Sequence, residues 1–118
     1  MPLGAPGGDT QPQGMLQVLL NHLVFGMDIQ SSIEAPRFST HSQPNSFEPH
    51  EAKPGRLAIE EGIGQNIGKD LSDLGHDIEW LKTRSDAVAG VCAISANLET
   101  NVITGGADPR RSGRAMGW

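Results

Sequence analysis

The sequence has 118 residues, a net charge of −5 and 36% hydrophobic residues, which suits one domain with a modest core. The acidic balance argues against steering toward nucleic acid or an anionic membrane. No apolar run approaches the roughly 20 residues of a transmembrane helix. The single cysteine, Cys92, rules out an internal disulfide, and its apolar neighbours predict a buried structural thiol. The cellular compartment stays open.

A glycine turn opens the chain and leads into its first helix. The turn reads Gly4-Ala5-Pro6-Gly7-Gly8, and two adjacent glycines permit unusual backbone angles and leave their N–H groups uncovered. Thr10 and Gln13 have capping-box spacing at the start of a helix predicted over residues 10–25. Such a turn before a helix suits negative charge, either a bound anion or an oxyanion formed in a reaction. The local pattern by itself favours the alternative, a tight turn before a capped helix.

This first helix carries an apolar stripe that predicts burial against a sheet. The stripe recurs at helical spacing and comprises Leu16, Leu19, Leu20, Leu23, Val24 and Met27. Asp28 is expected to cap a short second helix that Pro36 stops. Arg37, beside that proline, is assigned a structural role.

The next elements are short and separated by a long polar loop. Residues 39–55 are predicted to form a surface loop with one short strand near Phe47. The histidines and glutamates of this loop lack metal-ligand spacing, so they are interpreted as solvated side chains. Alternation over residues 56–60 predicts a half-exposed strand.

A second glycine-rich stretch, around Ile67, looks like a nucleotide-binding loop but fails both nucleotide patterns. Ile67 stands where the dinucleotide fingerprint needs glycine, and Asp70 stands where a phosphate loop needs serine or threonine. Asn66 is instead expected to cap a short helix that Gly75 ends, with a strand following over residues 76–81.

The last third of the chain predicts a hairpin. Residues 88–96 are the most apolar strand candidate and are predicted to form a central strand buried on both faces. Residues 97–101 are expected to turn, and residues 102–104 to return as the partner strand. Arg110 and Arg111 are assigned structural or rim roles and not the binding of a substrate carboxylate.

Four short motifs together resemble the γ-glutamyltranspeptidase family, also called γ-glutamyltransferases or glutathione hydrolases. The first glycine turn is similar to the family's G-x-P-G-G loop, and three further motifs follow in the family's order: Ile33-Glu34-Ala35-Pro36-Arg37-Phe38, Leu74-Gly75-His76 and Gly106-Ala107-Asp108-Pro109-Arg110-Arg111. The resemblance covers essentially the whole chain. It implies an α+β fold that is part of an N-terminal-nucleophile hydrolase αββα sandwich, with antiparallel strands and packed helices. Residues 1–118 would then be one domain, the C-terminal segment of the small subunit.

The resemblance also implies a chemistry. Members of the family transfer or hydrolyse γ-glutamyl or related amides through an N-terminal threonine created by self-cleavage, and that residue belongs upstream of this sequence. By position, Gly7 and Gly8 match the paired glycines whose N–H groups form the oxyanion hole. Asp9, where transpeptidases often carry serine, is the candidate substrate-binding residue, and it keeps related amidohydrolases with non-glutamyl substrates open. No metal or organic cofactor is implied.

The implied partners are the large subunit, the upstream part of the small subunit and a small-molecule amide, with no nucleic acid and no membrane. The rival hypothesis is a non-catalytic domain that binds an anion at Gly7 and Gly8 and self-associates. The isolated chain is expected to self-associate because the strand over residues 88–96 and the first helix need more sheet than this chain contains. Whether the chain alone has any activity stays open.

Overall fold

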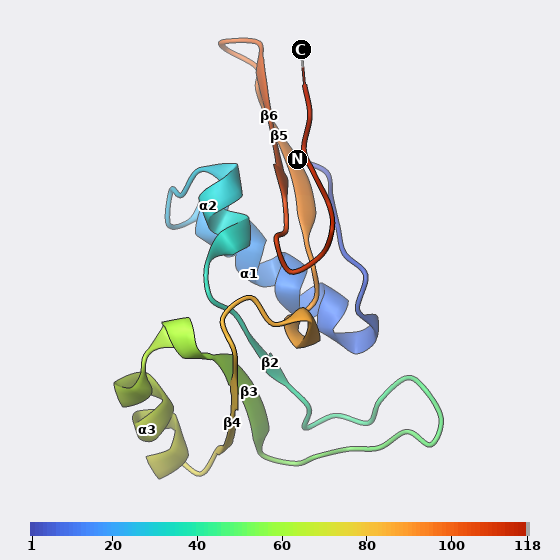
Figure 1. The fold of residues 1–118 in the computed structure, drawn as a ribbon, viewed down its shortest axis with the longest axis vertical. Coiled ribbons are helices and arrows are strands. Elements are labelled where there is room, and N and C mark those ends of the chain that lie inside the picture. The colour runs from blue at the N-terminus through green and yellow to red at the C-terminus, as the bar shows by residue number, and fades with distance from the viewer. Residues whose placement is uncertain (118) are drawn as a thin grey trace.

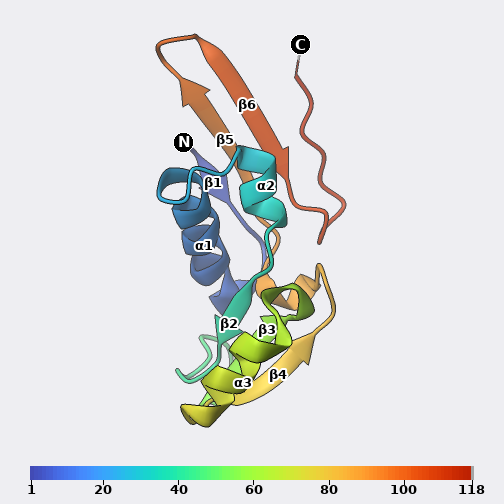
Figure 2. The ribbon, with the colours of Figure 1, turned by 90° about the vertical axis from the view of Figure 1, so that its left-hand side faces the viewer.

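Two three-stranded sheets that share no strand organise the chain (Figure 1). The computed structural model describes residues 1–117. The first sheet has the order β1 (Leu3–Gly4), β5 (Cys92–Asn97), β6 (Val102–Ala107), and the second has β2 (Phe38–Thr40), β3 (Arg56–Glu60), β4 (Asp77–Leu81). Figure 2 shows the sheets toward opposite ends of the molecule, with α1 (Gln11–Leu23) and α2 (Ile29–Glu34) beside the first and α3 (Gln65–Asp73) beside the second. The predicted α+β class is confirmed.

The first sheet is antiparallel and has β5 at its centre. β5 pairs with β1 and, through the predicted hairpin, with β6 from Cys92 opposite Ala107 to Asn97 opposite Val102. Burial on β5 alternates: Ala93 is 4% exposed, whereas Ile94 is 47% exposed. The predictions of a strand buried on both faces and of a buried Cys92 are therefore wrong, since Cys92 is exposed. Successive side chains point to opposite faces, and α1 and α2 cover only one of them.

The second sheet mixes both pairings. β2 pairs with β3 antiparallel, while β3 and β4 are parallel because α3 forms the crossover between them. β3 is buried along Leu57–Glu60, so its predicted half-exposure is wrong. The reason is its central place: Ile59 faces α3, where it lies close to Gly68, and Glu60 on the other face meets two arginines.

The helix boundaries follow local chemistry in part. Asp28 caps α2 by accepting a hydrogen bond from Ser31 N–H at 2.9 Å, and Gly75, with a φ of 99°, follows the end of α3, both as predicted. The predicted cap at Asn66 is wrong, because α3 starts after Gly64, whose φ of 98° turns the chain. The expected strand near Phe47 is also absent from the described residues; the strand in this part of the chain is β2, which precedes the loop.

Helix α1 packs on the first sheet through its small residues and not through its leucines. Gly14 and Val18 are its buried positions, and Val18 joins the core cluster of Ile29, Ile33, Val91 and Ala93. Most of the predicted apolar stripe instead faces outward, with Leu16 55% and Leu23 65% exposed, while Leu19 and Met27 are half-buried. Gly14 decides this orientation, since a Cβ there would lie 3.1 Å from the carbonyl oxygen of Val88. Within residues 1–117 no helix has both the length and the apolar character needed to cross a bilayer.

Candidate active-site turn

The glycine turn precedes α1 as a short 3-10 turn, η1 (Gly8–Thr10). Gly7 has a φ of 136° and Gly8 a φ of 58°, values that side chains other than glycine rarely adopt. There is also no room for a side chain at Gly7, because a Cβ there would lie 2.9 Å from Thr10 Oγ1 and 3.1 Å from Ala89 Cβ. The Thr10 hydroxyl donates to the Gly7 carbonyl at 2.8 Å, so the predicted capping box with Gln13 does not form. Both glycines are thus required by the shape of the turn.

The two glycine N–H groups differ in their partners. Gly7 is exposed, and its N–H has no hydrogen-bond acceptor within residues 1–117. Gly8 N–H faces the side chain of Gln11. With the Gln11 amide oriented to satisfy its neighbours, its oxygen accepts from Gly8 N–H at 3.2 Å and its nitrogen donates to the Ala5 carbonyl at 3.0 Å. One donor is therefore open and the other carries a long hydrogen bond to a neutral group, at the positive end of a helix.

Asp9 is tied to a distant loop. Its Oδ2 accepts from Ser46 N–H at 2.7 Å, and its Oδ1 accepts from the Ser46 hydroxyl at 2.6 Å. These bonds, the hydroxyl's first and the N–H's second, hold the pKa of Asp9 below its usual range. Asp9 is therefore ionised at neutral pH, and its role as a substrate-binding residue stays a prediction.

The start of α1 is also joined to the edge of β2. Gln13 accepts from Thr40 N–H at 2.8 Å and donates to the Thr40 carbonyl at 3.1 Å. One turn later Gln17 repeats the pattern on Phe38, accepting at 3.1 Å and donating at 2.9 Å. The two side chains occupy the outer edge of β2 in place of a strand. Sequence reasoning missed this contact, whose one local signal is the pair of glutamines four residues apart.

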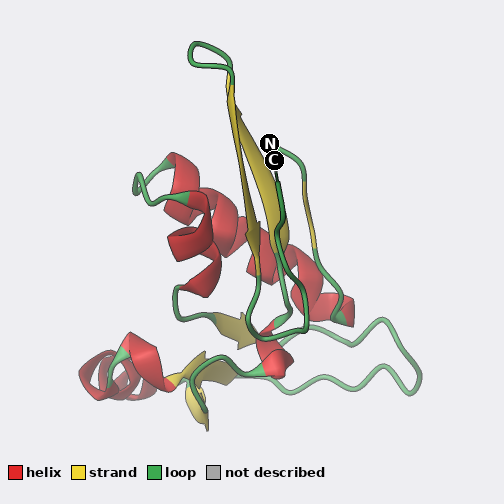
Figure 3. Cartoon of the chain, turned by 45° about the horizontal axis from the view of Figure 1, so that its top comes forward, coloured by secondary structure: helices red, strands yellow, loops and turns green. Residues whose placement is uncertain are grey.

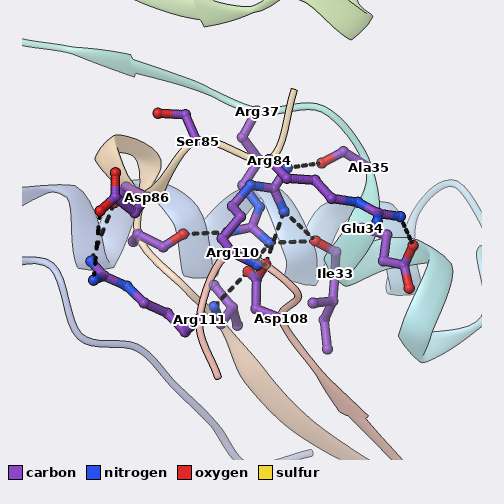
Figure 4. A network of polar contacts seen from close by, with 12 residues as sticks. Ile33, Glu34, Ala35, Arg37, Arg84, Ser85, Asp86, Asp108, Arg110 and Arg111 are labelled. Atoms are coloured by element: carbon purple, nitrogen blue, oxygen red, sulfur yellow. Dashed lines mark hydrogen bonds and ion pairs between the residues drawn. The ribbon is translucent and has the colours of Figure 1, made fainter. Parts of the chain in front are cut away.

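Two arginines and two carboxylates form a buried cluster, of which Figure 4 shows Arg37, Arg110 and Asp108 close together. Arg37 pairs with Asp108 at 2.5 Å, and Arg110 pairs with Glu60 at 2.5 Å and with Asp108 at 3.1 Å. None of these side chains is more than 1% exposed. The formal charges cancel, which is the condition under which buried ions are tolerated.

The cluster joins both sheets and the segment that supports the glycine turn. Arg37 donates to the Ala89 carbonyl at 2.9 Å, and Asp108 accepts from Val91 N–H at 2.8 Å. Gly7 packs on Ala89, so the cluster sets the position of the surface on which the turn rests. Arg37 and Arg110 thus have the structural role predicted for them. Arg111 is 43% exposed, 4.0 Å from Asp86, in the predicted rim position.

Burial and pairing compete in the pKa values of the cluster. Burial alone raises the pKa of Asp108, but the N–H groups of Val91 and Arg110 and the guanidinium of Arg37 together hold it below its usual range. Burial lowers the pKa of Arg37. For Arg110 the same effect of burial is outweighed by Glu60 and Asp108, which raise its pKa. All these shifts leave both arginines charged and Asp108 ionised.

Comparison with known proteins gives consistent matches over the whole chain. The family model described as Gamma-glutamyltranspeptidase matches residues 1–118. The chain is 29% identical over 115 residues to the glutathione hydrolase proenzyme of Bacillus subtilis strain 168, covering 98% of this chain and 17% of that protein. It is 30% identical over 121 residues to the oxamate amidohydrolase proenzyme of Klebsiella pneumoniae, covering 100% of this chain and 21% of that protein.

A solved structure gives the same match in three dimensions. The crystal structure of cephalosporin acylase from Bacillus halodurans superposes with a TM-score of 0.81 at 28% identity, covering 99% of this chain and 20% of that one. The chain thus spans about a fifth of the length of the proteins that it matches.

Proposed function

Because the chain belongs to the γ-glutamyltranspeptidase family, we propose that it supplies the oxyanion-hole turn of a γ-glutamyltransferase-like amide hydrolase. Its α+β fold is part of the N-terminal-nucleophile hydrolase sandwich. In this proposal residues 1–118 form one domain, the C-terminal segment of the small subunit, and the attacking threonine lies outside them. The observation that carries the proposal is that Gly7 is an exposed residue whose N–H has no acceptor within residues 1–117, next to Gly8 before the N-terminus of α1.

The proposed reaction uses the turn when charge develops on the substrate. The threonine oxygen attacks the amide carbonyl carbon, and the carbonyl oxygen becomes an oxyanion that accepts from Gly7 N–H and Gly8 N–H. An oxyanion is a stronger acceptor than the Gln11 carboxamide, so it displaces Gln11 from Gly8. Collapse releases the amine, which carries off the proton from the threonine hydroxyl. The acyl group then passes from threonine to water or to an acceptor amine.

The partners in this proposal are protein segments and a small amide. Both curated relatives are proenzymes, which supports an upstream part of the small subunit and a large subunit as partners. In this proposal Asp9, which directly follows Gly8, lies on the substrate side of the turn. Its negative charge disfavours a carboxylate close by and attracts the ammonium of a γ-glutamyl group, so the charge alone does not choose the acyl group, and an amidohydrolase with a non-glutamyl substrate is the second candidate. The relative named oxamate amidohydrolase supports a non-glutamyl substrate, although oxamate is itself a carboxylate.

The test removes the proposed donors from the complete, processed enzyme. Gly7→Pro and Gly8→Pro each delete one N–H, and each is expected to lower the acylation rate of an anilide substrate by about 10²–10³-fold with a smaller effect on binding. Since proline also restricts the backbone, circular dichroism and melting must show a folded enzyme, and Gly117→Pro serves as the control with open space around it. Folded variants that acylate at the wild-type rate would show that these groups do not form the hole. The 118-residue chain alone is expected to cleave no γ-glutamyl anilide.

A non-catalytic, self-associating domain that binds an anion at the turn is the other candidate. The exposed apolar end of α1 favours self-association, with Val24 66% and Phe25 71% exposed. The outer edges of β4 and β6 have no strand partner within residues 1–117, so a strand of a second copy can pair with them. The outer edge of β2 differs, because the side chains of Gln13 and Gln17 bind its backbone. Sedimentation of the isolated chain across a dilution series tests this, and a monomer at every concentration would contradict it.

A further inference from the structure

The long loop between β2 and β3 extends past the start of α1 (Figure 3), and it contacts the glycine turn and the residue that follows it. It is held there at two points on the start of α1: Thr40, at the beginning of the loop, by Gln13, and Ser46, near its tip, by Asp9. Within the loop, Asn45 N–H donates to the Glu51 carbonyl at 2.9 Å. The loop therefore has a defined position against the turn.

Phe47, next to Ser46, places its ring on Gly8. A Cβ built on Gly8 would lie 3.0 Å from Phe47 Cε2. The backbone of Phe47 is fixed on both sides, because its N–H donates to Asn45 Oδ1 at 2.9 Å and its carbonyl accepts from His50 N–H at 2.7 Å. The side chain nevertheless remains 64% exposed. An aromatic ring is thus held, largely uncovered, beside Gly8 of the glycine turn.

We propose that Phe47 is a specificity-determining residue, positioned by the Asp9–Ser46 contact, whose ring receives an apolar acyl group of the amide bound at Gly7 and Gly8. This inference rests on the function proposed above and names its substrate class: amides of aryl or alkyl acids. An exposed ring gains by removal from water when an apolar group covers it. The ionised Asp9 beside it disfavours a carboxylate at the same place. The ring thus favours an apolar acyl chain, and Asp9 disfavours a negatively charged one.

The experiment compares two substrates of the complete, processed enzyme that share one leaving group, γ-glutamyl p-nitroanilide and phenylacetyl p-nitroanilide. Phe47→Ala is expected to lower kcat/KM for the phenylacetyl compound about five- to tenfold and to change that of the γ-glutamyl compound less than about twofold. Phe47→Leu, which keeps apolar bulk, is expected to fall in between. Phe25→Ala is the matched control, because Phe25 is also exposed and lies beyond the far end of α1.

The positioning part has its own test. Ser46→Ala removes the hydroxyl that binds Asp9 and is expected to shift the substrate ratio in the same direction as Phe47→Ala, while Ser46→Thr, which keeps a hydroxyl, restores it. A Ser46→Ala ratio equal to that of the wild type would overturn the positioning role.

The outcomes separate this inference from the proposed function. If the wild-type enzyme cleaves an anilide and a Gly8→Pro variant shown to be folded acylates about 10²–10³-fold more slowly, the proposed function stands. An unchanged substrate ratio in Phe47→Ala, or an equal loss for both substrates, then overturns the inference alone. An enzyme that cleaves neither anilide refutes both.

Discussion

Asp108 and Asp9 both accept hydrogen bonds on both carboxylate oxygens, but one lies in the interior and the other at the surface. Asp108 is 1% exposed and is bound by the side chains of two arginines and by the backbone N–H groups of Val91 and Arg110. Asp9 is bound by a single residue, Ser46, in an exposed contact. Asp108 accepts four hydrogen bonds and Asp9 two. Loss of a partner also has different consequences at the two sites, because an unpaired charge in the interior has no water to replace its partner, whereas a surface charge does.

The buried and the exposed contacts also hold together different parts of the molecule. The two sheets share no strand, and the interior cluster joins them through Arg37 before β2, Glu60 at the end of β3 and Asp108 after β6. The Asp9 contact holds only the tip of one loop. We therefore expect changes in the cluster to affect the whole fold, and changes at Asp9 to affect the loop alone.

The largest effect is expected from Arg110→Met. Removing this guanidinium leaves Glu60 and part of Asp108 buried without their charge partner, so the free energy of unfolding should fall by about 3–5 kcal/mol in denaturant titration. The neighbouring Arg111→Met is the control and should change it by less than about 0.5 kcal/mol, because Arg111 is exposed. Equal effects of the two substitutions would remove the contrast between interior and surface.

The next prediction concerns the loss of stability at low pH through Asp108. The folded pKa of Asp108 is lowered, so the stability from its ionised form is fully present above the unfolded value near 3.8 and is lost as pH falls through the lower folded value. Asp108→Asn lacks this titration. The difference in free energy of unfolding between wild type and variant should therefore be constant at pH values above the ordinary aspartate pKa. At lower pH this difference should become smaller. A difference that does not narrow between neutral pH and acid would show that Asp108 is not the group responsible.

A smaller effect is expected at the edge of β2. Replacing Gln13 and Gln17 by alanine removes four hydrogen bonds to the backbone of β2 in an exposed place where water can substitute, so each substitution should cost about 1 kcal/mol. The freed edge should also increase self-association in sedimentation. Gln65→Ala, an exposed glutamine in α3, is the control for losing a glutamine. No increase in self-association would show that this edge is protected in another way.

Local chemistry predicts several features of this fold correctly. The cap of α2 at Asp28, the end of α3 at Gly75 and the hairpin over residues 97–101 each depend on residues that are neighbours in sequence. The glycine turn is also local, which is why its shape could be expected from Gly7 and Gly8, while its role as an oxyanion hole stays a prediction.

Features set by distant residues could not be predicted in this way. The outward stripe of α1 depends on how closely Gly14 approaches Val88, and the exposure of Cys92 on which face of β5 the helices cover. Arg37 and Asp108 are 71 residues apart, and Asp9 and Ser46 are 37 apart, without a periodic pattern to connect them. The contact that places Phe47 beside the turn therefore appears only in three dimensions.

The smallest effect on the fold is expected from Ser46→Ala, and it is the sharpest test of the surface side of the comparison. The melting temperature should not change measurably, because the contact is exposed. Amide hydrogen exchange at residues 45–47 should accelerate, since the loop tip loses the hydroxyl bond and opens locally without global unfolding.

The pKa of Asp9, followed by NMR, should rise toward 3.8 in the same variant, because the Ser46 hydroxyl is the first cause of its lowering. The remaining Ser46 N–H should keep the pKa from reaching that value. In the wild type the contact is present above the ordinary aspartate range and is lost only as pH falls through the lower folded pKa, so exchange at the loop tip should accelerate in acid there and at a higher pH in the variant. A lower melting temperature with unchanged local exchange would mean that this contact supports the whole fold, as the buried cluster does.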